Sequence, residues 1–130
     1  MSLDENKIKR ELFEKGLKAY NERKFYDAHE YWEELWSDYY LKDAKFIQAL
    51  IQLSVGYFHI TNNNKNGALG LLKKCKPKFE MFKPACRGID VLYILKCIDK
   101  SLICLNEIEE MKMFNWQLVP KIEIDGTRTI

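Results

Sequence analysis

The densest group of side chains that could do chemistry lies in the segment His-Glu-Tyr-Trp-Glu-Glu-Leu-Trp, which begins at His29. Imidazole and carboxylate groups can move protons or bind metal ions, and tryptophans can line an apolar pocket. At about 100° per residue, a helix turns Glu30 away and gathers four other side chains on one face. The four are His29, Trp32, Glu33 and Trp36. We expect this aromatic face to point to the core, where a carboxylate needs a polar partner.

A second set of polar side chains follows on the next helical segment, from about residue 43 to residue 60. Gln48, Gln52 and His59 fall within about 40° of one another on a segment that is otherwise apolar in nearly every direction. A helix that is apolar on most sides is expected to be buried among others. We therefore expect its polar stripe to face the first one, giving a semi-buried cluster of two imidazoles, one carboxylate and two amides.

Three interpretations of this cluster remain open on the sequence alone. The first is a hydrogen-bond network that only fixes the register of two helices. The second is a pocket for a small ligand or a partner peptide, lined by Trp32, Trp36 and Tyr57. The third is a zinc or iron site made by His29, Glu33 and His59. The segment resembles the metalloprotease pattern His-Glu-x-x-His, but Glu33 stands where the second histidine belongs, so a protease is not predicted.

Other function classes lack their signatures. The chain has no glycine-rich nucleotide loop and no Gly-x-Ser-x-Gly motif. Its four cysteines, at positions 75, 86, 97 and 104, form no Cys-x-x-Cys pair, so we interpret them as free thiols that fill the core. A basic segment that could attract nucleic acid lies between residues 73 and 87, but the net charge is only +2 and nucleic-acid binding is not predicted. The basic residues are Lys73, Lys74, Lys76, Lys78, Lys83 and Arg87.

The hydrophobic pattern predicts five helices. Apolar residues recur at steps of three and four over about 4–20, 25–40 and 89–111, and the segment 43–60 is apolar nearly all round. A turn at 62–64 caps a fourth helix, which Pro77 is expected to kink or end, and Pro84 and Gly88 mark a loop. The alternation from Pro120 to Gly126 resembles a lone strand, so we expect an extended tail that Trp116 or Leu118 pins to the fold, or disorder.

These elements predict an all-α, multihelical bundle of about five helices around a buried central helix. Gly16 precedes Ala28 by twelve residues, and Gly56 precedes Ala68 by the same number. Small residues at those points would let paired helices cross closely, as in hairpins of tetratricopeptide type, and a longer helix closes the bundle. We assign residues 4–112 to one helical domain and 113–130 to an extended C-terminal tail, and we interpret Met1 to Leu3 as a cloning remnant.

The length of 130 residues suits one domain, and 47% hydrophobic with 31% charged residues argues for a globular fold. No apolar run is long enough to span a bilayer, and the first ten residues are too charged for a signal peptide. We therefore expect a cytoplasmic protein with no membrane partner. The sequence leaves open the identity of its partners and whether it forms a homodimer.

The ordered series of motifs resembles the domain of unknown function 309 family, which consists of small helical proteins. The resemblance is carried by Phe-Tyr-Asp-Ala-His-Glu from Phe25, by Leu-Ile-Gln from Leu50, by Tyr-Phe-His from Tyr57, and by Gly-Ile-Asp-Val from Gly88. It extends from about Gly16 to Leu105 and implies a multihelical bundle around a buried helix. It also implies that five polar residues of this chain belong to the pattern of the family, but it assigns no activity to them. The five are His29, Glu30, Glu33, Gln52 and His59.

From these observations we expect a non-catalytic module that binds a ligand or a protein through the His/Glu/Gln/Trp cluster. No cofactor is firmly implied. The alternative is a metal-dependent enzyme in which His29, Glu33 and His59 hold a divalent ion.

Overall fold

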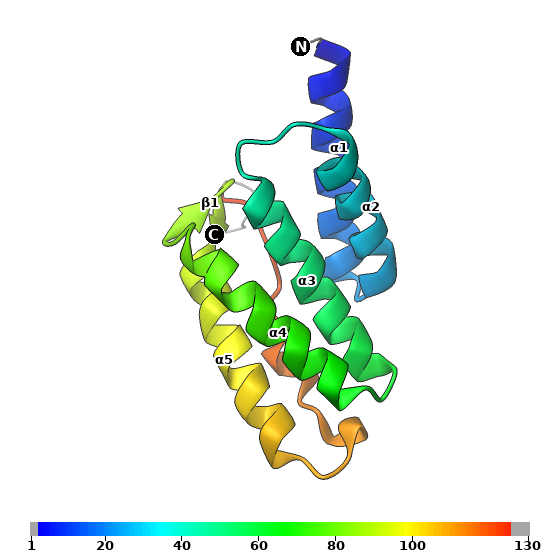
Figure 1. Cartoon of the computed structure of the whole chain (residues 1–130), viewed down its shortest axis with the longest axis vertical. Coiled ribbons are helices and arrows are strands. Elements are labelled where there is room, and N and C mark those ends of the chain that lie inside the picture. Colours follow the sequence, from blue (N-terminus) through cyan, green and yellow to red (C-terminus); the bar gives the residue numbers. More distant parts are fainter. Residues whose placement is uncertain (1–2, 126–130) are drawn as a thin grey trace.

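The computed structural model describes residues 3–125 and has five helices in chain order (Figure 1). Helices α1 (Leu3–Asn21) and α2 (Phe25–Asp38) form one antiparallel hairpin, and α3 (Ala44–Thr61) and α4 (Lys65–Glu80) form a second. Helix α5 (Val91–Glu107) packs on α4. The all-α bundle is therefore confirmed. Helix α5 has 17 residues, fewer than α1 with 19 or α3 with 18, so the expected longer closing helix is wrong.

The two hairpins repeat one another at an interval of forty residues. At the first turn Arg23 N–H bonds to Tyr20 O at 2.9 Å, and at the second Asn63 N–H bonds to Ile60 O at 3.1 Å. Arg23 and Asn63 also share a positive φ, of 63° and 58°. Matching hydrogen bonds and backbone angles at matching positions make the repeat structural, as the glycine and alanine spacing predicted.

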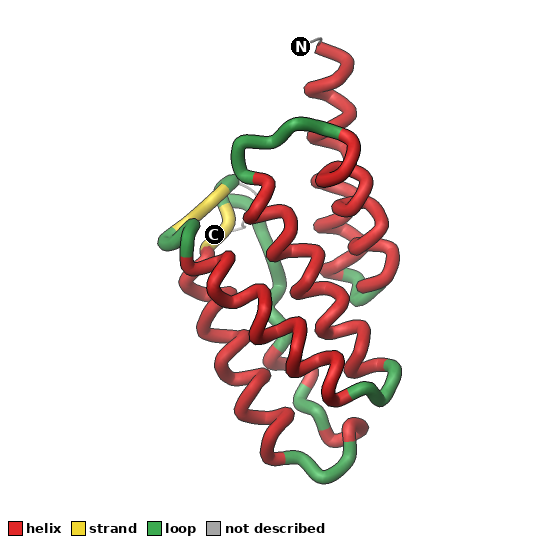
Figure 2. The backbone as a smooth tube through the Cα atoms, viewed as in Figure 1, coloured by secondary structure: helices red, strands yellow, loops and turns green. Residues whose placement is uncertain are grey.

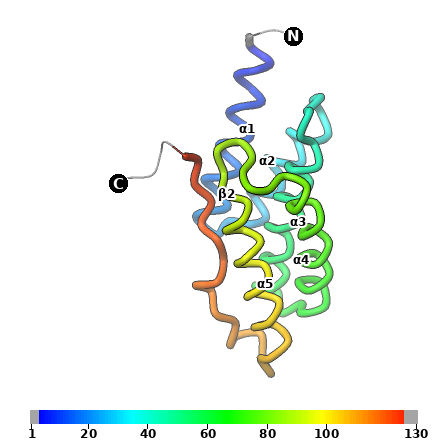
Figure 3. The backbone as a smooth tube through the Cα atoms, turned by 90° about the vertical axis from the view of Figure 1, so that its left-hand side faces the viewer, coloured from blue at the N-terminus to red at the C-terminus, as the bar shows by residue number. Residues whose placement is uncertain are grey.

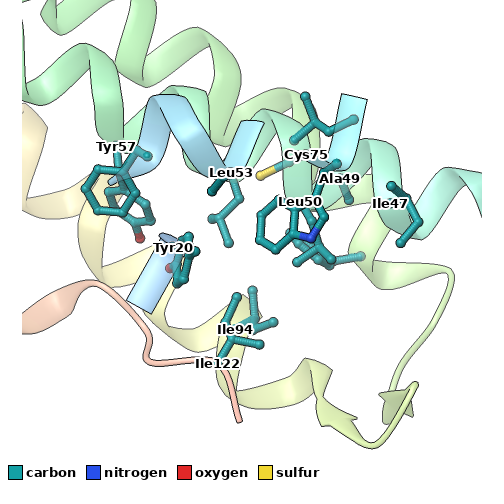
Figure 4. Packing of buried hydrophobic residues seen from close by; sticks show 14 of the residues in the cluster. Tyr20, Ile47, Ala49, Leu50, Leu53, Tyr57, Cys75, Ile94 and Ile122 are labelled. Carbon is teal, nitrogen blue, oxygen red and sulfur yellow. The ribbon is translucent and has the colours of Figure 1, made fainter. Parts of the chain in front are cut away.

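Helix α3 is the central element of the bundle. It contacts both α2 and α4, and its buried residues include Phe46, Leu50, Leu53 and Tyr57, which are 0% exposed. Figure 4 shows Leu50, Leu53 and Tyr57 in one cluster with Ile122, which comes from the tail. The apolar character of this segment on most of its sides therefore predicted its position correctly.

Several boundaries differ from the sequence expectation. Helix α4 continues three residues past Pro77, so this proline does not end the helix, and the alternative expectation of a kink stays a prediction. Pro77 is exposed, and on that side of a helix the carbonyl that proline leaves unpaired can be hydrated. The predicted loop around Gly88 holds a short antiparallel hairpin of β1 (Ala85–Cys86) and β2 (Ile89–Asp90) (Figure 2). Two positive φ angles, at Arg87 and Gly88, suit its two-residue turn.

The C-terminal segment is packed and not a loose tail. After α5 it forms two short 3-10 helices, η1 (Met111–Met113) and η2 (Trp116–Leu118), and then returns along the bundle toward the β-hairpin (Figure 3). Phe114 and Ile122 are buried in the core, and the indole of Trp116 stacks on Phe25 with 6.2 Å between ring centroids. An extended tail pinned by Trp116 is thus what the structure has. Residues 126–130, the rest of the predicted tail, lie outside the described residues.

At the N-terminus, α1 begins at Leu3, and Met1 and Ser2 lie outside the described residues. Over residues 3–125, no helix combines the length and the apolar character that crossing a membrane requires.

Candidate functional site

The polar residues of α2 lie beside its buried face and not on it. That face consists of Phe25, Ala28, Trp32 and Leu35. Trp32 is 0% exposed and its indole N–H donates to Phe13 O at 3.2 Å, so it belongs to the core. The Glu33 side chain is 52% exposed and Trp36 is 39% exposed. The expectation that all four stripe residues face the core is therefore wrong for Glu33 and Trp36, which are turned toward the solvent-exposed flank of the helix.

His29 stands between the core and that flank. Its Nε2 lies 3.6 Å from Oε2 of Glu33, one helical turn further on, and its side chain is 25% exposed. The other ring nitrogen, Nδ1, is buried and has no hydrogen-bond partner among the described residues. The predicted His29–Glu33 pair is thus present, but it leaves one polar atom of the imidazole unsatisfied.

Helix α3 packs against α2 next to this flank. The rings of Tyr26 and Phe58 lie 5.4 Å apart, and α2 and α3 run in opposite directions, so each turn further along α2 faces an earlier turn of α3. Along the helix axes this register puts Gln52 near the level of Glu33. Around α3, however, Gln52 lies about 120° from Phe58, on the same side as His59. Gln52 is half-buried, and its Oε1 is a second buried atom without a partner in the described part of the chain.

Gln48, also half-buried, lies one turn before Gln52 on α3, near the level of Trp36. Exposed aromatic rings border the flank at both ends, since Tyr26 is 51% and Trp36 39% exposed. We call His29, Glu33, Gln52 and these two rings the α2–α3 cluster. That the second polar stripe meets the first remains a prediction.

His59 is not part of this cluster. Its Nδ1 lies 3.3 Å from the side-chain nitrogen of Asn64, the residue that caps α4, and a Cβ at Gly67 would lie 2.9 Å from the His59 ring. His59 thus belongs to the turn between α3 and α4. Within residues 3–125, no three His, Cys, Asp or Glu side chains are grouped so that they could hold a metal ion. The structure does not bring His29, Glu33 and His59 together.

Two other predicted residues also have different surroundings. Tyr57, expected in the pocket wall, is fully buried, and its hydroxyl is 2.9 Å from that of Ser101 on α5. Burial raises its pKa well above the usual tyrosine value. Glu30 points to the opposite flank of α2, where it lines a hollow of about 260 Å³ with Asp27, Tyr31 and Glu34.

The electrostatic character of α2 is uniform. The helix carries five carboxylates and no lysine or arginine, and all five of these residues are exposed. They are Asp27, Glu30, Glu33, Glu34 and Asp38. The basic segment is different, because three of its six cations are paired in the structure: Lys76 with Asp99, Lys83 with Glu80, and Arg87 with Asp43. The acidic helix is therefore the less neutralised of the two charged surfaces.

A cleft of about 850 Å³ lies away from the cluster, where the turn after α3 meets the start of the tail. Ile60, Lys65, Met111 and Trp116 are among its lining residues, and none of the predicted site residues is. No sequence pattern indicated this cleft, because its two walls are about fifty residues apart in the chain and meet only through the return of the tail.

Residues 13–71 match the model of a family described as a domain of unknown function (DUF309). This confirms the resemblance that the motifs indicated, over a shorter range than the expected one, which extended to Leu105. His29, Glu33, Gln52 and His59 all lie inside the matched range. No curated protein matches the chain.

Proposed function

The resemblance to the DUF309 family brings no activity with it, and from the geometry of the site we propose a non-catalytic protein-binding module that takes an arginine side chain from a basic partner at the α2–α3 cluster. One observation carries this proposal: each of the two neighbouring helices has a buried polar atom without a partner among the described residues, His29 Nδ1 beside the Glu33 carboxylate on α2 and Gln52 Oε1 on α3.

The chemistry of these two atoms selects the kind of ligand. Gln52 Oε1 can only accept hydrogen bonds. A neutral imidazole whose Nε2–H points to the Glu33 carboxylate leaves Nδ1 as a second acceptor. Two acceptors on neighbouring helices, one of them in a side chain beside a carboxylate, favour a positively charged ligand with several N–H donors.

A guanidinium group fits this arrangement better than an ammonium group. Its five N–H donors lie in one plane, so it can donate to a Glu33 oxygen and, once the side chains of His29 and Gln52 turn toward it, to their unpaired acceptors as well. Its flat faces also stack on aromatic rings, and Tyr26 and Trp36 are exposed beside the cluster. The other four carboxylates of α2 would attract further cations of the same partner segment and raise the rate of association.

The expected cytoplasmic location belongs to this proposal as well. The alternative, a metal-dependent enzyme, has no supporting geometry, because it needs His29, Glu33 and His59 to converge on one ion. Elemental analysis of the purified protein tests it separately.

The test is binding of three synthetic nonapeptides that differ only in their repeated residue, arginine, lysine or glutamate, measured by fluorescence anisotropy at low and high salt. We expect the arginine peptide to bind most tightly, the lysine peptide more weakly and the glutamate peptide not at all. Glu33→Gln should weaken binding of the arginine peptide about tenfold, as the loss of one charge-assisted hydrogen bond predicts.

The matched control is Glu107→Gln, which removes the same charge from an exposed position at the end of α5. It should weaken binding less than twofold. If both variants lost the same affinity for the arginine peptide, binding would depend only on net charge. That result would contradict a site at the α2–α3 cluster.

A further inference from the structure

The tail is held both by hydrogen bonds to its backbone and by packing of its side chains. Asn21 makes two hydrogen bonds with the main chain of Ile122: its side-chain nitrogen donates to Ile122 O at 2.8 Å, and its side-chain oxygen accepts from Ile122 N at 2.9 Å. The buried hydroxyl of Tyr20 donates to Pro120 O at 2.8 Å. At the end of the described segment, Asp125 N–H donates to Gly88 O at 2.7 Å. These contacts would accept any extended backbone, whatever its side chains.

Side chains along the same segment also contact the bundle, among them those of Phe114, Trp116 and Ile122. Arg23 lies over the Trp116 ring, 5.5 Å from its centroid, and donates to Trp116 O at 3.2 Å. Trp116 itself stacks on Phe25, while Phe114 packs near Tyr57 with 6.4 Å between ring centroids. Ile122 is 2% exposed within the core cluster. An extended chain bound by main-chain hydrogen bonds, with a few side chains in pockets, is a recurring mode of peptide recognition.

The holding residues and the held segment come from different parts of the chain. Tyr20, Asn21, Arg23 and Phe25 surround the first hairpin turn and lie within residues 13–71, the range of the family match, as does Tyr57. The tail lies entirely outside that range. We call these five residues the tail-binding face.

We infer that the tail-binding face is a site for an extended peptide segment, and that residues 114–125 of this chain are its intramolecular occupant. In trans the site takes a segment with an aromatic residue, a proline four residues later and an aliphatic residue two positions after that, as in Trp116, Pro120 and Ile122. Proline is accepted because the hydrogen bond at this position uses its carbonyl and needs no N–H. This site does not share a residue with the α2–α3 cluster, so neither proposal depends on the other.

Covalent attachment favours the chain's own tail. A tethered segment acts at an effective concentration in the millimolar range, so a free segment of similar intrinsic affinity competes poorly until the tail is released. The intact protein should therefore bind a free tail peptide at least about a hundredfold more weakly than a protein whose tail has been freed.

The experiment places a protease cleavage sequence between Glu109 and Glu110, which are exposed, and cuts the folded full-length chain there. A fluorescein-labelled peptide of residues 111–125 is then added to cut and uncut protein, and anisotropy reports binding. We expect the labelled peptide to replace the cut tail and to bind uncut protein at least about a hundredfold more weakly. Asn21→Ala should weaken binding to the cut protein roughly tenfold, as two lost hydrogen bonds predict.

Asn66→Ala is the control, because Asn66 is exposed on α4 and apart from the tail contacts; it should leave peptide affinity unchanged. Circular dichroism of the cut protein, after its tail has been removed, shows whether the helices stay folded without the tail. Loss of the helical signal would show that the tail is an integral part of the fold and would overturn the inference. So would a folded cut protein that never exchanges its tail, or one that binds a scrambled peptide equally well.

Discussion

Gly16 of α1 and Trp32 of α2 are in direct contact, and the indole lies where a side chain at position 16 would begin. The second hairpin repeats this relationship forty residues later, where a Cβ on Gly56 would lie 3.1 Å from Leu72. In each hairpin a glycine on the first helix thus lies against a large core residue on the second. This contact explains why small residues at this position signalled the repeat.

Gly16→Ala should destabilise the protein by at least about 2 kcal/mol, because the added methyl group overlaps the Trp32 ring and one of the two helices must move. Gly70→Ala is the matched change, since nothing lies within 4 Å of a Cβ at this position in α4. It should stabilise the protein by about 0.5–1 kcal/mol through helix propensity. Urea unfolding of the three proteins gives both values, and equal effects of the two substitutions would contradict the packing.

Asp43, which precedes α3, should make stability depend on pH in the acid range. Arg87 of the β-hairpin donates to its two carboxylate oxygens at 2.6 and 3.0 Å. Burial alone would raise the pKa of Asp43, but the hydrogen bonds and charge of Arg87 outweigh it, so that the pKa is lowered from its usual 3.8. The stability from this pair is therefore present above pH 4 and is lost as the pH falls through the lowered pKa.

Asp43→Asn should cost about 1–2 kcal/mol at pH 7 and should flatten the loss of stability between pH 5 and pH 2. Urea midpoints at several pH values measure this. Asp38→Asn, at an exposed position at the end of α2, should leave the pH profile unchanged. A D43N profile as steep as that of the wild type would show that the Arg87 pair does not carry the effect.

Cys75 should not react with thiol reagents while the protein is folded. Its side chain is 0% exposed, and burial raises its pKa to about 12, so almost no thiolate forms at pH 8. Cys104 is half-buried and should be modified much faster. Timed alkylation with peptide mass mapping separates the two, and denaturation in urea should make Cys75 react as fast as Cys104. Rapid modification of Cys75 in the native protein would contradict its burial.

The helices were predictable because their signals are local. Apolar spacing and polar turns located all five to within a few residues, and the small-residue pairs indicated the repeat. The β-hairpin and the packed tail were harder to predict, because both depend on distant contacts. Tyr20 bonds to Pro120 and Asn21 to Ile122 across about a hundred residues, and no local pattern records such a pairing.

The candidate site was only partly predictable for a geometric reason. The position of Glu33 and Trp36 on α2 depends on where the buried face is centred, and that centre is set by packing against α1 and α3. We expected Trp36 to lie in the core because tryptophan is large and apolar, whereas it is 39% exposed in the structure. His59 lies on the same stripe of α3 as Gln52, but its side chain contacts Asn64, which caps the next helix. The spacing within α3 alone could not predict this contact.

The most direct test of the arginine site is to observe its two unsatisfied atoms. In a ¹⁵N-labelled protein, adding the arginine nonapeptide should shift the His29 ring nitrogens and the Gln52 side-chain amide together, with a common saturation curve. The lysine peptide should shift them less, and Gln117, exposed on η2, should not move. Saturable binding that leaves both His29 and Gln52 unchanged, or no binding at low salt, would contradict the proposed function.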